Sequence, residues 1–578
     1  MNLKQTLDAA LSTALDRASG ESGCQALVAP AKNPQFGDYQ ANGVMALAKR
    51  LGRNPRELGA AVVAQFERDP LAARLADKLE LAGPGFINIF LKAEFLGAEL
   101  DALHEQRLMP PSAAPQTIVI DYSSPNLAKE MHVGHLRGTI IGDAIARTFD
   151  YLGHHLIRQN HFGDWGTQFG MLIAYMEELP RSGDLHTELS DLESFYRAAK
   201  QRFDADPAFA TLARANVVKL QAGDPECLAL WRRFIAISIE HCQALYDKLG
   251  ITLGPEHIVP ESFYNERLEP LVADLKTQGL LSESDGAECV FLDEFKNKNG
   301  EPLPVIVQKS DGGYLYATTD LAAIRYRCQE LHAERVLYLV DARQSLHFQQ
   351  VFAVARKAGY APPECQLEHL SYGTMMGKDG KPFKTRSGDT IKLVDLCGES
   401  IERAHALVRE KNPQLGDAEQ RQVAATVGIA AVKYADLSKN RNSDYIFDWD
   451  TMLSFEGNTA PYLLYAYARI RSIFRRAGLD PDARYPISAP AQAEEKTLAL
   501  KLLQFSETIE TLAQDCLPNQ LCLYLYELAG HFMKFYEACP VLKAEGKERD
   551  SRLGLCQLSA RTLRQGLALL GIDTLEQM

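Results

Sequence analysis

The stretch of this sequence that decides its fold is Asp121-Tyr-Ser-Ser-Pro-Asn-Leu-Ala-Lys-Glu-Met-His-Val-Gly-His135. It overlaps a β-branched run, Thr117 to Tyr122 (TIVIDY), which is typical of a strand. Beyond it, apolar residues recur at helical spacing as far as Leu152, and Gly153 supplies a stop signal. The stretch is therefore predicted to be a turn from strand to helix. At such a turn, free backbone N–H groups and the helix dipole favour an anion.

Two histidines, His132 and His135, end this turn with Gly134 between them. A glycine leaves room for a flat ring to lie against the backbone. Imidazole N–H groups can donate to phosphate oxygens as charge builds on them during a displacement. The turn is therefore a candidate site for phosphate chemistry, in which orientation and charge stabilisation supply the rate.

Length and composition indicate a multidomain globular protein. A chain of 578 residues suits three or four domains, and 46% hydrophobic with 24% charged residues is ordinary for such proteins. The N-terminus is typical of an amphipathic helix and not of a signal peptide, and no apolar run is long enough for a membrane helix. Eleven scattered cysteines without a CxxC pair indicate neither a zinc ribbon nor a disulfide framework. We expect a reduced, cytoplasmic protein.

The formal net charge of −13 does not favour a nucleic-acid partner if it is taken as an average. However, basic and acidic residues balance from Pro461 to the end, so the acidic excess lies upstream. Binding RNA requires basic patches, not a basic average. The charge distribution therefore permits an RNA partner without indicating one.

The order of the expected elements suggests three parts. A first unit closes with a strand-like GPGFINIFL (Gly83 to Leu91), and the proline-rich Pro110–Pro115 breaks the chain after it. Strands then alternate with helices, which predicts an α/β fold with a parallel sheet. The expected strands are Thr117–Tyr122, His155–His161, Tyr314–Ala317 and Arg335–Asp341. Residues 171–258 form a helical, charged insertion, and from Phe455 onward the pattern is helical.

The tetrapeptide HVGH resembles the HIGH signature of class I aminoacyl-tRNA synthetases. Its flanks, SSPNLAKEMHVGHLRGTIIGD (Ser123–Asp143) and NHFGDWGTQFG (Asn160–Gly170), are similar to those of arginyl-tRNA synthetases of bacterial type, and the resemblance spans the chain. It implies a Rossmann-like catalytic domain with a helical connective insertion, an α+β N-terminal add-on domain and an all-α anticodon-binding domain. The implied bounds are 1–112 for the add-on domain, 113–454 for the catalytic domain and 455–578 for the anticodon-binding domain.

The same resemblance implies the reaction. An ATP-dependent ligase would activate L-arginine as arginyl-adenylate and transfer it to the 3′ end of tRNA(Arg). Mg²⁺ would accompany ATP without a protein metal site. No zinc, organic cofactor or membrane partner is implied, and we expect a monomer.

Carboxylates are expected to select arginine, because a guanidinium pairs bidentately with them. Asp121 ends a strand at the edge where open α/β sheets bind ligands, and Asp320 would start a helix. By resemblance these two acids hold the guanidinium beside Tyr316, while Asn126 and Gln344 fix the amino-acid head group and His135 contributes. From the residues alone, Asp320 could equally be a helix-capping acid and Tyr316 a core tyrosine.

The second ATP element departs from the class pattern. Where KMSKS is expected, the chain has the glycine-rich basic segment Lys378–Gly388, KDGKPFKTRSG. In a subset of arginyl enzymes a lysine just before the HIGH element compensates, and Lys129 stands there. The catalytic residues implied are His132, His135, Lys129, Lys381 and Lys384. The ATP-binding residues implied are His132, Gly134, His135, Met376 and Lys384.

The RNA-binding residues are expected at both ends of the chain. Single-stranded bases are read by stacking on aromatic rings, although an aromatic stripe at helical spacing is more often core. The resemblance points to the turn with Asn33, Phe36, Asp38 and Gln40, and in the C-terminal region to Tyr462, Arg469 and Arg561.

Three other interpretations stay open at this point. One is an adenylate-forming nucleotidyltransferase that acts on a small molecule, which would leave the end domains unexplained. Another is a catalytically silent RNA-binding paralogue, against which the intact His132, His135, Asp121 and Asp320 speak. A third is a class I enzyme of another specificity, such as cysteine or glutamate, which two acids suited to a cation do not favour.

Overall fold

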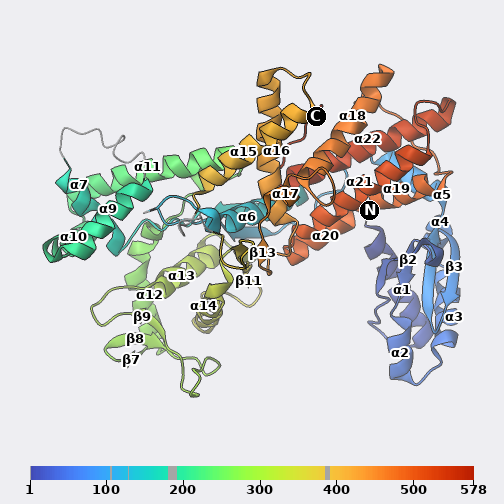
Figure 1. Ribbon diagram of the computed structural model, residues 1–578. Helices are drawn as coiled ribbons and strands as arrows, with labels where there is room; N and C mark the ends of the chain where they lie inside the picture. Colours follow the sequence, from blue (N-terminus) through green and yellow to red (C-terminus); the bar gives the residue numbers. More distant parts are fainter. Residues whose placement is uncertain (1, 105–106, 128, 180–191, 384–390) are drawn as a thin grey trace. The chain divides into compact units, whose positions relative to one another are not determined.

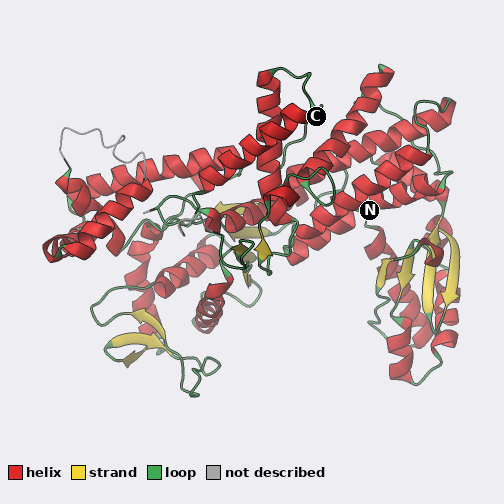
Figure 2. Ribbon diagram, in the orientation of Figure 1, coloured by secondary structure: helices red, strands yellow, loops and turns green. Residues whose placement is uncertain are grey.

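The computed structural model describes residues 2–104, 107–127, 129–179, 192–383 and 391–578. The chain divides into two compact units. The first joins Met1–Pro111 with Ser454–Ala568 and Asp573–Met578, and the second consists of Ser112–Leu453 with Leu569–Ile572. Figure 1 traces both units along the chain, and Figure 2 shows that helices predominate and strands form small separate groups.

A parallel sheet is the centre of the second unit. Its strand order is β11-β10-β5-β6. The bounds are β5 (Thr117–Asp121), β6 (His155–Gln159), β10 (Arg335–Tyr338) and β11 (Gln366–His369). The apolar runs of β5 and β10 are buried, as expected of strands covered on both faces. The expected α/β class with a parallel sheet is confirmed.

The order of the strands places a crevice at the end of β5. Helix α6 (Val133–Leu152) leads from β5 to its neighbour β6, whereas β10 pairs with the other edge of β5. The strand order therefore reverses between β5 and β10, and ligands bind at such a switch point in open α/β sheets. The register pairs Asp121 with Tyr338 there, so both residues border the crevice.

One expected strand, Tyr314–Ala317, is wrong. Helix α13 (Tyr316–Arg325) begins inside it, and Tyr314 forms only an isolated bridge to Gln308. Tyr and Thr favour strands as isolated residues. However, Leu315 adopts an extended N-cap conformation, and its N–H donates to the Thr318 hydroxyl at 3.4 Å. This capping of the helix overrides the local strand preference.

The rest of the second unit is mainly helical, and the helical character expected of residues 171–258 is confirmed. The insertion consists of α7 (Thr167–Glu178), α9 (Leu192–Ala205), α10 (Pro207–Gln221) and α11 (Pro225–Leu249). The other helices are η2 (Pro255–His257), η3 (Glu261–Tyr264), α12 (Asn265–Thr277), the π-helical turn η4 (Tyr326–Glu330), η5 (Ala342–Gln344), α14 (Ser345–Lys357), α15 (Leu393–Lys411), α16 (Asp417–Leu437) and α17 (Trp449–Met452). The remaining strands are β7 (Ser282–Ser284), β8 (Ala287–Val290), β9 (Val305–Gln308), β12 (Met375–Met376) and β13 (Tyr445–Ile446).

The first unit combines an antiparallel sheet with helices from both ends of the chain. Its sheet has the order β1-β2-β4-β3, with β1 (Val28–Pro30), β2 (Tyr39–Ala41), β3 (Ala76–Ala82) and β4 (Phe86–Leu91). The N-terminal helices are α1 (Leu3–Ser19), η1 (Pro34–Phe36), α2 (Val44–Leu51), α3 (Pro55–Phe66), α4 (Pro70–Leu75) and α5 (Ala93–Ala102). The C-terminal helices, orange to red in Figure 1, are α18 (Ala460–Ala477), α19 (Ala493–Leu503), α20 (Phe505–Asp515), α21 (Asn519–Ala538) and α22 (Gly546–Leu569).

Buried polar contacts hold the two ends of the chain together within the first unit. The hydroxyl of Tyr39 in β2 donates to Glu507 in α20 at 2.5 Å. The neighbouring Asp38 pairs with Lys496 of α19 at 3.0 Å. A buried carboxylate must be paired or hydrogen-bonded, so both contacts fix the N-terminal sheet against the C-terminal helices.

The described helices include none that is both long and apolar enough to cross a membrane. Each of the eleven cysteines is free and buried.

A buried ion pair holds helix α6, which begins at the histidine turn. Arg137 contacts Asp436 of α16 at 3.1 Å, and both side chains are at most 2% exposed. The Arg137 guanidinium also donates to the carbonyl of Ser443 at 2.9 Å. Removing one partner of such a pair leaves an uncompensated buried charge.

We predict that Asp436→Ala lowers the free energy of unfolding of the second unit by about 3–5 kcal/mol, because Arg137 stays buried without its acid. Urea unfolding followed by circular dichroism measures the effect. Arg421→Ala is the matched control, because it breaks an exposed pair with Asp417 on the same helix α16. That control should lose less than about 1 kcal/mol. Equal losses in the two variants would contradict the importance of the buried pair.

Candidate active site

The two histidines of the turn cap helix α6 reciprocally. His132 is the N-cap residue, and its Nδ1 accepts a hydrogen bond from the Gly134 N–H at 3.1 Å. In return, Nδ1 of His135 accepts from the His132 N–H at 3.1 Å. Because both Nδ1 atoms are acceptors, the proton of each neutral ring is on Nε2. Each ring can therefore donate from Nε2 to an oxyanion.

Burial lowers the pKa of His135 to about 3, and the neighbouring His132 adds to this effect. The ring centroids of the two histidines are 4.1 Å apart. A ring with this pKa is neutral at physiological pH and acts as a hydrogen-bond donor, not as a cation. A Cβ at Gly134 would lie 2.8 Å from the His132 ring, which explains the glycine between them.

The backbone of the turn is strained just after β5. Ser123 and Ser124 have φ values of 70° and 44°, in the left-handed region that side chains disfavour. Hydrogen bonds hold this conformation: the Ser124 hydroxyl donates to Asp121 at 2.7 Å, and its N–H donates to Asn160 at 3.0 Å. Strain of this kind persists where the surroundings over-determine it, and it is common at functional sites.

Asp121 is at the bottom of the crevice with both carboxylate oxygens already hydrogen-bonded. It is 6% exposed, and Arg327 donates to its Oδ2 at 2.7 Å. The same arginine donates to Gln159 at 2.6 Å and is fully buried. An incoming guanidinium would therefore meet an aspartate whose charge is shared with an internal arginine.

Asp320 is more accessible and belongs to the same neighbourhood. It lies in α13, and its Oδ2 contacts Nε2 of His347 at 2.5 Å. Burial raises the pKa of Tyr338 above its ordinary value, Arg327 opposes this, and Asp320 and Asp121 both add to the rise. Both predicted acids therefore lie close enough to the buried Tyr338 ring to raise its pKa. The structure thus brings Asp121 and Asp320 into one neighbourhood.

A third carboxyl group, Glu261, joins this cluster. Burial and, to a smaller extent, the negative charges of Asp164 and Asp320 raise its pKa to about 8. Glu261 also contributes, after burial, to a raised pKa of Tyr316. The cluster of Asp121, Asp320 and Glu261 is therefore short of positive charge, which a cationic ligand would supply.

The other residues expected at the arginine site are Tyr316, Gln344 and Asn126. Tyr316 begins α13 and is 69% exposed, so it is not a core tyrosine. Gln344 is exposed at the start of α14. The side chain of Asn126 lies beside Gly163, where an added Cβ would come within 3.2 Å of its amide. All three therefore belong to loops or helix ends, not to the core.

The predicted basic residues are only partly described. Lys129 is exposed, and its Nζ lies 4.6 Å from the ring centroid of Tyr196. Lys381 is also exposed, and its backbone N–H donates to Asp379 at 3.1 Å. Met376 ends β12, which pairs with β13. Lys384 lies outside the described residues.

The N-terminal residues expected to bind RNA divide into two kinds. Asn33 and Phe36 are exposed around the helical turn η1. Asp38 instead accepts from the Leu91 N–H at 2.6 Å, in addition to its pairing with the α19 lysine. Gln40 donates to Asn88 at 2.7 Å. Asp38 therefore has a structural role in this unit, whatever else it contacts.

The C-terminal candidates Tyr462 and Arg469 share one face of α18. Tyr462 packs edge to face on Tyr526, and Arg469 lies 5.4 Å over the ring of Tyr536, both from α21. Arg561, on α22, belongs elsewhere: its Nη1 donates to the carbonyl of Leu103 at 2.7 Å.

Sequence reasoning missed three residues of the site: Arg327, His347 and Glu261. Arg327 lies in the π-helical turn η4, a rare element that often marks functional sites. Its partner Asp121 is 206 residues away, so no local pattern indicates the pair. Glu261 can be recognised as part of the candidate site only in the folded structure, where it lies close to Asp164 and Asp320.

Within the described ranges, no group of three or more His, Cys, Asp or Glu side chains is placed to hold a metal ion.

Family models match almost the whole chain. Residues 100–449 match the catalytic domain described as tRNA synthetases class I (R). Residues 1–91 match the arginyl tRNA synthetase N terminal domain, and residues 463–578 match the DALR anticodon binding domain.

Individual relatives match over the same length. The chain is 56% identical to an arginine–tRNA ligase of Marinomonas sp. and 56% identical to one of Chromobacterium violaceum, with all of each chain covered. Among solved structures, the arginyl-tRNA synthetase of Plasmodium falciparum aligns with a TM-score of 0.85 at 30% identity, over 100% of this chain and 99% of that one. The enzyme of Thermus thermophilus aligns with a TM-score of 0.84 at 26% identity, over 100% of both chains. The histidine turn, the acidic crevice and these matches agree, and the chain belongs to the class I arginyl-tRNA synthetases, the arginine–tRNA ligases.

Proposed function

We propose that the chain charges tRNA(Arg) in two steps at the crevice between β5 and β10. A carboxylate oxygen of L-arginine attacks the α-phosphorus of ATP, the bond to the β-phosphate breaks, and pyrophosphate leaves with Mg²⁺. A ribose hydroxyl at the 3′ end of tRNA then attacks the arginyl carbonyl, and AMP leaves. One observation supports this best. The Nε2 atoms of His132 and His135 and the carboxyl groups of Asp121, Asp320 and Glu261 lie near the same switch point of the sheet.

The carboxylate cluster gives the specificity for arginine. A guanidinium offers five donors in a planar fork and stays charged, so it matches carboxylates that lack cationic partners. Asp320 and Glu261 are the accessible acids. Asp121 accepts further hydrogen bonds from the guanidinium through the lone pairs that Ser124 and Arg327 do not use. Tyr316 closes over the guanidinium, while Asn126 and Gln344 hold the α-amino and carboxylate groups.

The histidines and lysines act on ATP. The Nε2–H groups of His132 and His135 donate to α-phosphate oxygens, and Gly134 leaves space for the phosphate beside the backbone. Lys129, Lys381 and Lys384 neutralise the leaving pyrophosphate, and Met376 packs beside the adenine. Neutral histidines fit this role. Their Nε2–H groups donate to the phosphate without gaining or losing a proton, so the site need not rearrange during the step.

The RNA contacts and setting complete the proposal. Three domains are proposed, of residues 1–112, 113–454 and 455–578. Asn33, Phe36 and Gln40 face the tRNA elbow, with Asp38 supporting them. Tyr462, Arg469 and Arg561 serve the anticodon side. The free cysteines fit a reducing cytoplasm, and one copy of the chain supplies every residue named, so we propose a monomer.

One experiment tests the function directly. Purified chain is given unfractionated tRNA, ATP, Mg²⁺ and each of the twenty amino acids in turn, and charging is measured. Only arginine should be attached. Pyrophosphate exchange with arginine but independent of tRNA would favour a small-molecule adenylate-forming enzyme, and RNA binding without charging would favour a silent paralogue.

We predict that His135→Ala lowers kcat/KM for arginine activation about 10²- to 10³-fold, because a preorganised donor to the transition state is lost. The tRNA dissociation constant should stay within about twofold, since His135 is not among the residues proposed to bind tRNA. Pyrophosphate exchange and filter binding measure the two quantities. His155→Ala, an exposed histidine at the start of β6, is the control. A parallel loss of RNA binding would indicate misfolding and void the assignment.

We predict that Asp320→Asn raises KM for arginine about 10- to 100-fold, because one charge-assisted pair with the guanidinium is lost. KM for ATP should change little. Steady-state aminoacylation with each substrate varied measures both. Asp311→Asn, an exposed acid in the loop before α13, provides the control. A defect confined to ATP would show that Asp320 is misassigned.

We predict that arginine binds more tightly as pH rises through about 8, and that Glu261→Gln removes this dependence. Burial raises the pKa of Glu261 from 4.5 to about 8, so its carboxyl group holds a proton at neutral pH. A guanidinium favours the ionised form, and binding therefore releases that proton. Calorimetric titrations with arginine between pH 6.5 and 9 measure the effect. A wild-type affinity that is flat across this range would exclude Glu261 from the site.

A further inference from the structure

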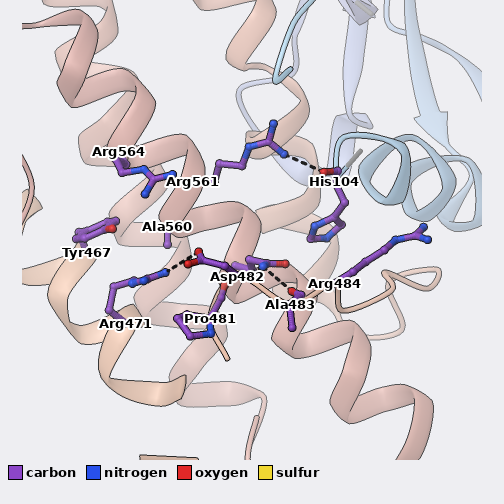
Figure 3. Close-up of a pocket in the computed structure, with 11 residues that line it drawn as sticks. His104, Tyr467, Arg471, Pro481, Asp482, Ala483, Arg484, Ala560, Arg561 and Arg564 are labelled. Atoms are coloured by element: carbon purple, nitrogen blue, oxygen red, sulfur yellow. Dashed lines mark hydrogen bonds and ion pairs between the residues drawn. The ribbon is translucent and has the colours of Figure 1, made fainter. Parts of the chain in front are cut away.

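A cavity of about 360 Å³ lies in the first unit, which contains none of the proposed catalytic residues. Its walls come from α18, α22, the loop that follows α18, and His104 just after α5. Figure 3 shows these side chains around the space between the helices. The volume falls in the range of small-molecule sites.

Four arginines and one acid, Asp482, line the cavity, which is therefore basic on balance. Arg561 and Arg564 extend from α22, and Arg471 extends from α18 (Figure 3). Two of the arginines are paired with acids: Arg471 lies 2.7 Å from Glu576 and 3.5 Å from Asp482, and Arg484 lies 2.8 Å from Asp101. Arg561 donates through Nη1 to the main-chain carbonyls of Leu103 and His104.

Arg564 is the basic group best placed to receive a ligand. It is exposed, lines the cavity and forms no hydrogen bond or ion pair with any residue in the described part of the chain. Its charge acts on Tyr467, whose pKa burial raises while Arg471 and Arg564 oppose the rise. Arg564 is therefore close to the cavity wall and has its donors available.

Two neutral polar atoms of the cavity lining are also without partners. Nε2 of His104 and Oε1 of Gln557 are buried, and neither has a hydrogen-bond partner among the described residues. The Gln557 amide nitrogen is used, because it donates to the carbonyls of Pro481 and Ala483. An orphaned acceptor beside a basic group calls for a ligand that has both hydroxyl or amino donors and a negative charge.

The cavity contains Arg561, which is also proposed to contact RNA, but it lies on a different face of α18 from Tyr462 and Arg469. Successive residues of a helix are about 100° apart. Arg471 on α18 is therefore on nearly the opposite side from Arg469, two residues before it, and Tyr467 is likewise turned away from Tyr462. The cavity residues Tyr467 and Arg471 share one face of α18, four residues apart.

We infer that the cavity binds one phosphate-bearing nucleotide, with the phosphate on Arg564 and Arg561 and the sugar or base against His104 and Gln557. A guanidinium fork matches phosphate geometry, and ribose hydroxyls and base amino groups supply the donors that Gln557 lacks. The nucleotide comes either from bound RNA or from free mononucleotide. The RNA source rests on the proposed function, and the free source does not.

The test compares the full-length chain with Arg564→Gln, Arg564→Lys and the control Arg476→Gln. Arg476 is an exposed arginine in the last turn of α18 outside the cavity, so its loss removes the same charge from the same unit. The first arm measures tRNA binding by anisotropy between 50 and 300 mM salt. The second arm titrates AMP into each chain by calorimetry, with and without the His135→Ala change that weakens the ATP site.

If RNA is the source, Arg564→Gln weakens tRNA binding about tenfold and lowers the slope of log affinity against log salt by about 1, with kcat unchanged. Arg564→Lys recovers part of the affinity. If free nucleotide is the source, AMP shows a binding event that survives His135→Ala and disappears in Arg564→Gln. The inference is overturned if Arg564→Gln changes neither titration, or changes them no more than Arg476→Gln does. Both arms measure binding alone. If the unaltered chain fails to charge tRNA, that result contradicts the proposed function but leaves the test of this cavity unaffected.

Discussion

The reciprocal capping of α6 by His132 and His135 is the constraint on which the catalytic crevice depends. A helix leaves its first N–H groups without partners, and here imidazole nitrogens accept two hydrogen bonds from the main chain of this turn. The same hydrogen bonds fix each neutral ring as the Nε2–H tautomer. The hydrogen bonds that cap α6 therefore also leave two Nε2–H donors for an anion at the positive end of the helix dipole.

The acidic side of the crevice follows a complementary logic. Asp121 is buried and already shares its charge with Arg327, which makes it stable without a ligand. Glu261 forms no ion pair with any of the described residues, and burial raises its pKa to about 8, so it keeps a proton at neutral pH. The acidic cluster is therefore stable without a ligand. In the proposed function a guanidinium stabilises it further, because the cation takes the place of the proton on Glu261. This difference between the two acids explains how a cluster of carboxyl groups persists in a low-dielectric crevice.

Much of this organisation could be predicted from the sequence, because local patterns determine it. The run TIVIDY gives β5, the 3.6-residue repeat after His135 gives α6, and both were confirmed. The expected strand at Tyr314–Ala317 was wrong because capping at Leu315 starts a helix there. Arg327 and Glu261 could not be predicted, since their partners come from distant segments and short-range periodicity carries no information about such pairs. The same holds for the left-handed serines after β5.

The N-terminal turn shows how one short segment can serve structure and recognition together. Tyr39 is buried and donates to Glu507 of α20, and its half-buried neighbour Asp38 pairs with Lys496 of α19. Asn33 and Phe36, only a few residues earlier, are exposed. A turn anchored at one end presents its free end with little conformational entropy left to lose on binding. An exposed phenylalanine is costly in water unless a partner covers it, and a nucleobase provides a flat apolar surface of the right kind. If the exposed pair binds RNA as proposed, the anchored turn does so at a lower entropic cost than a mobile loop of the same residues.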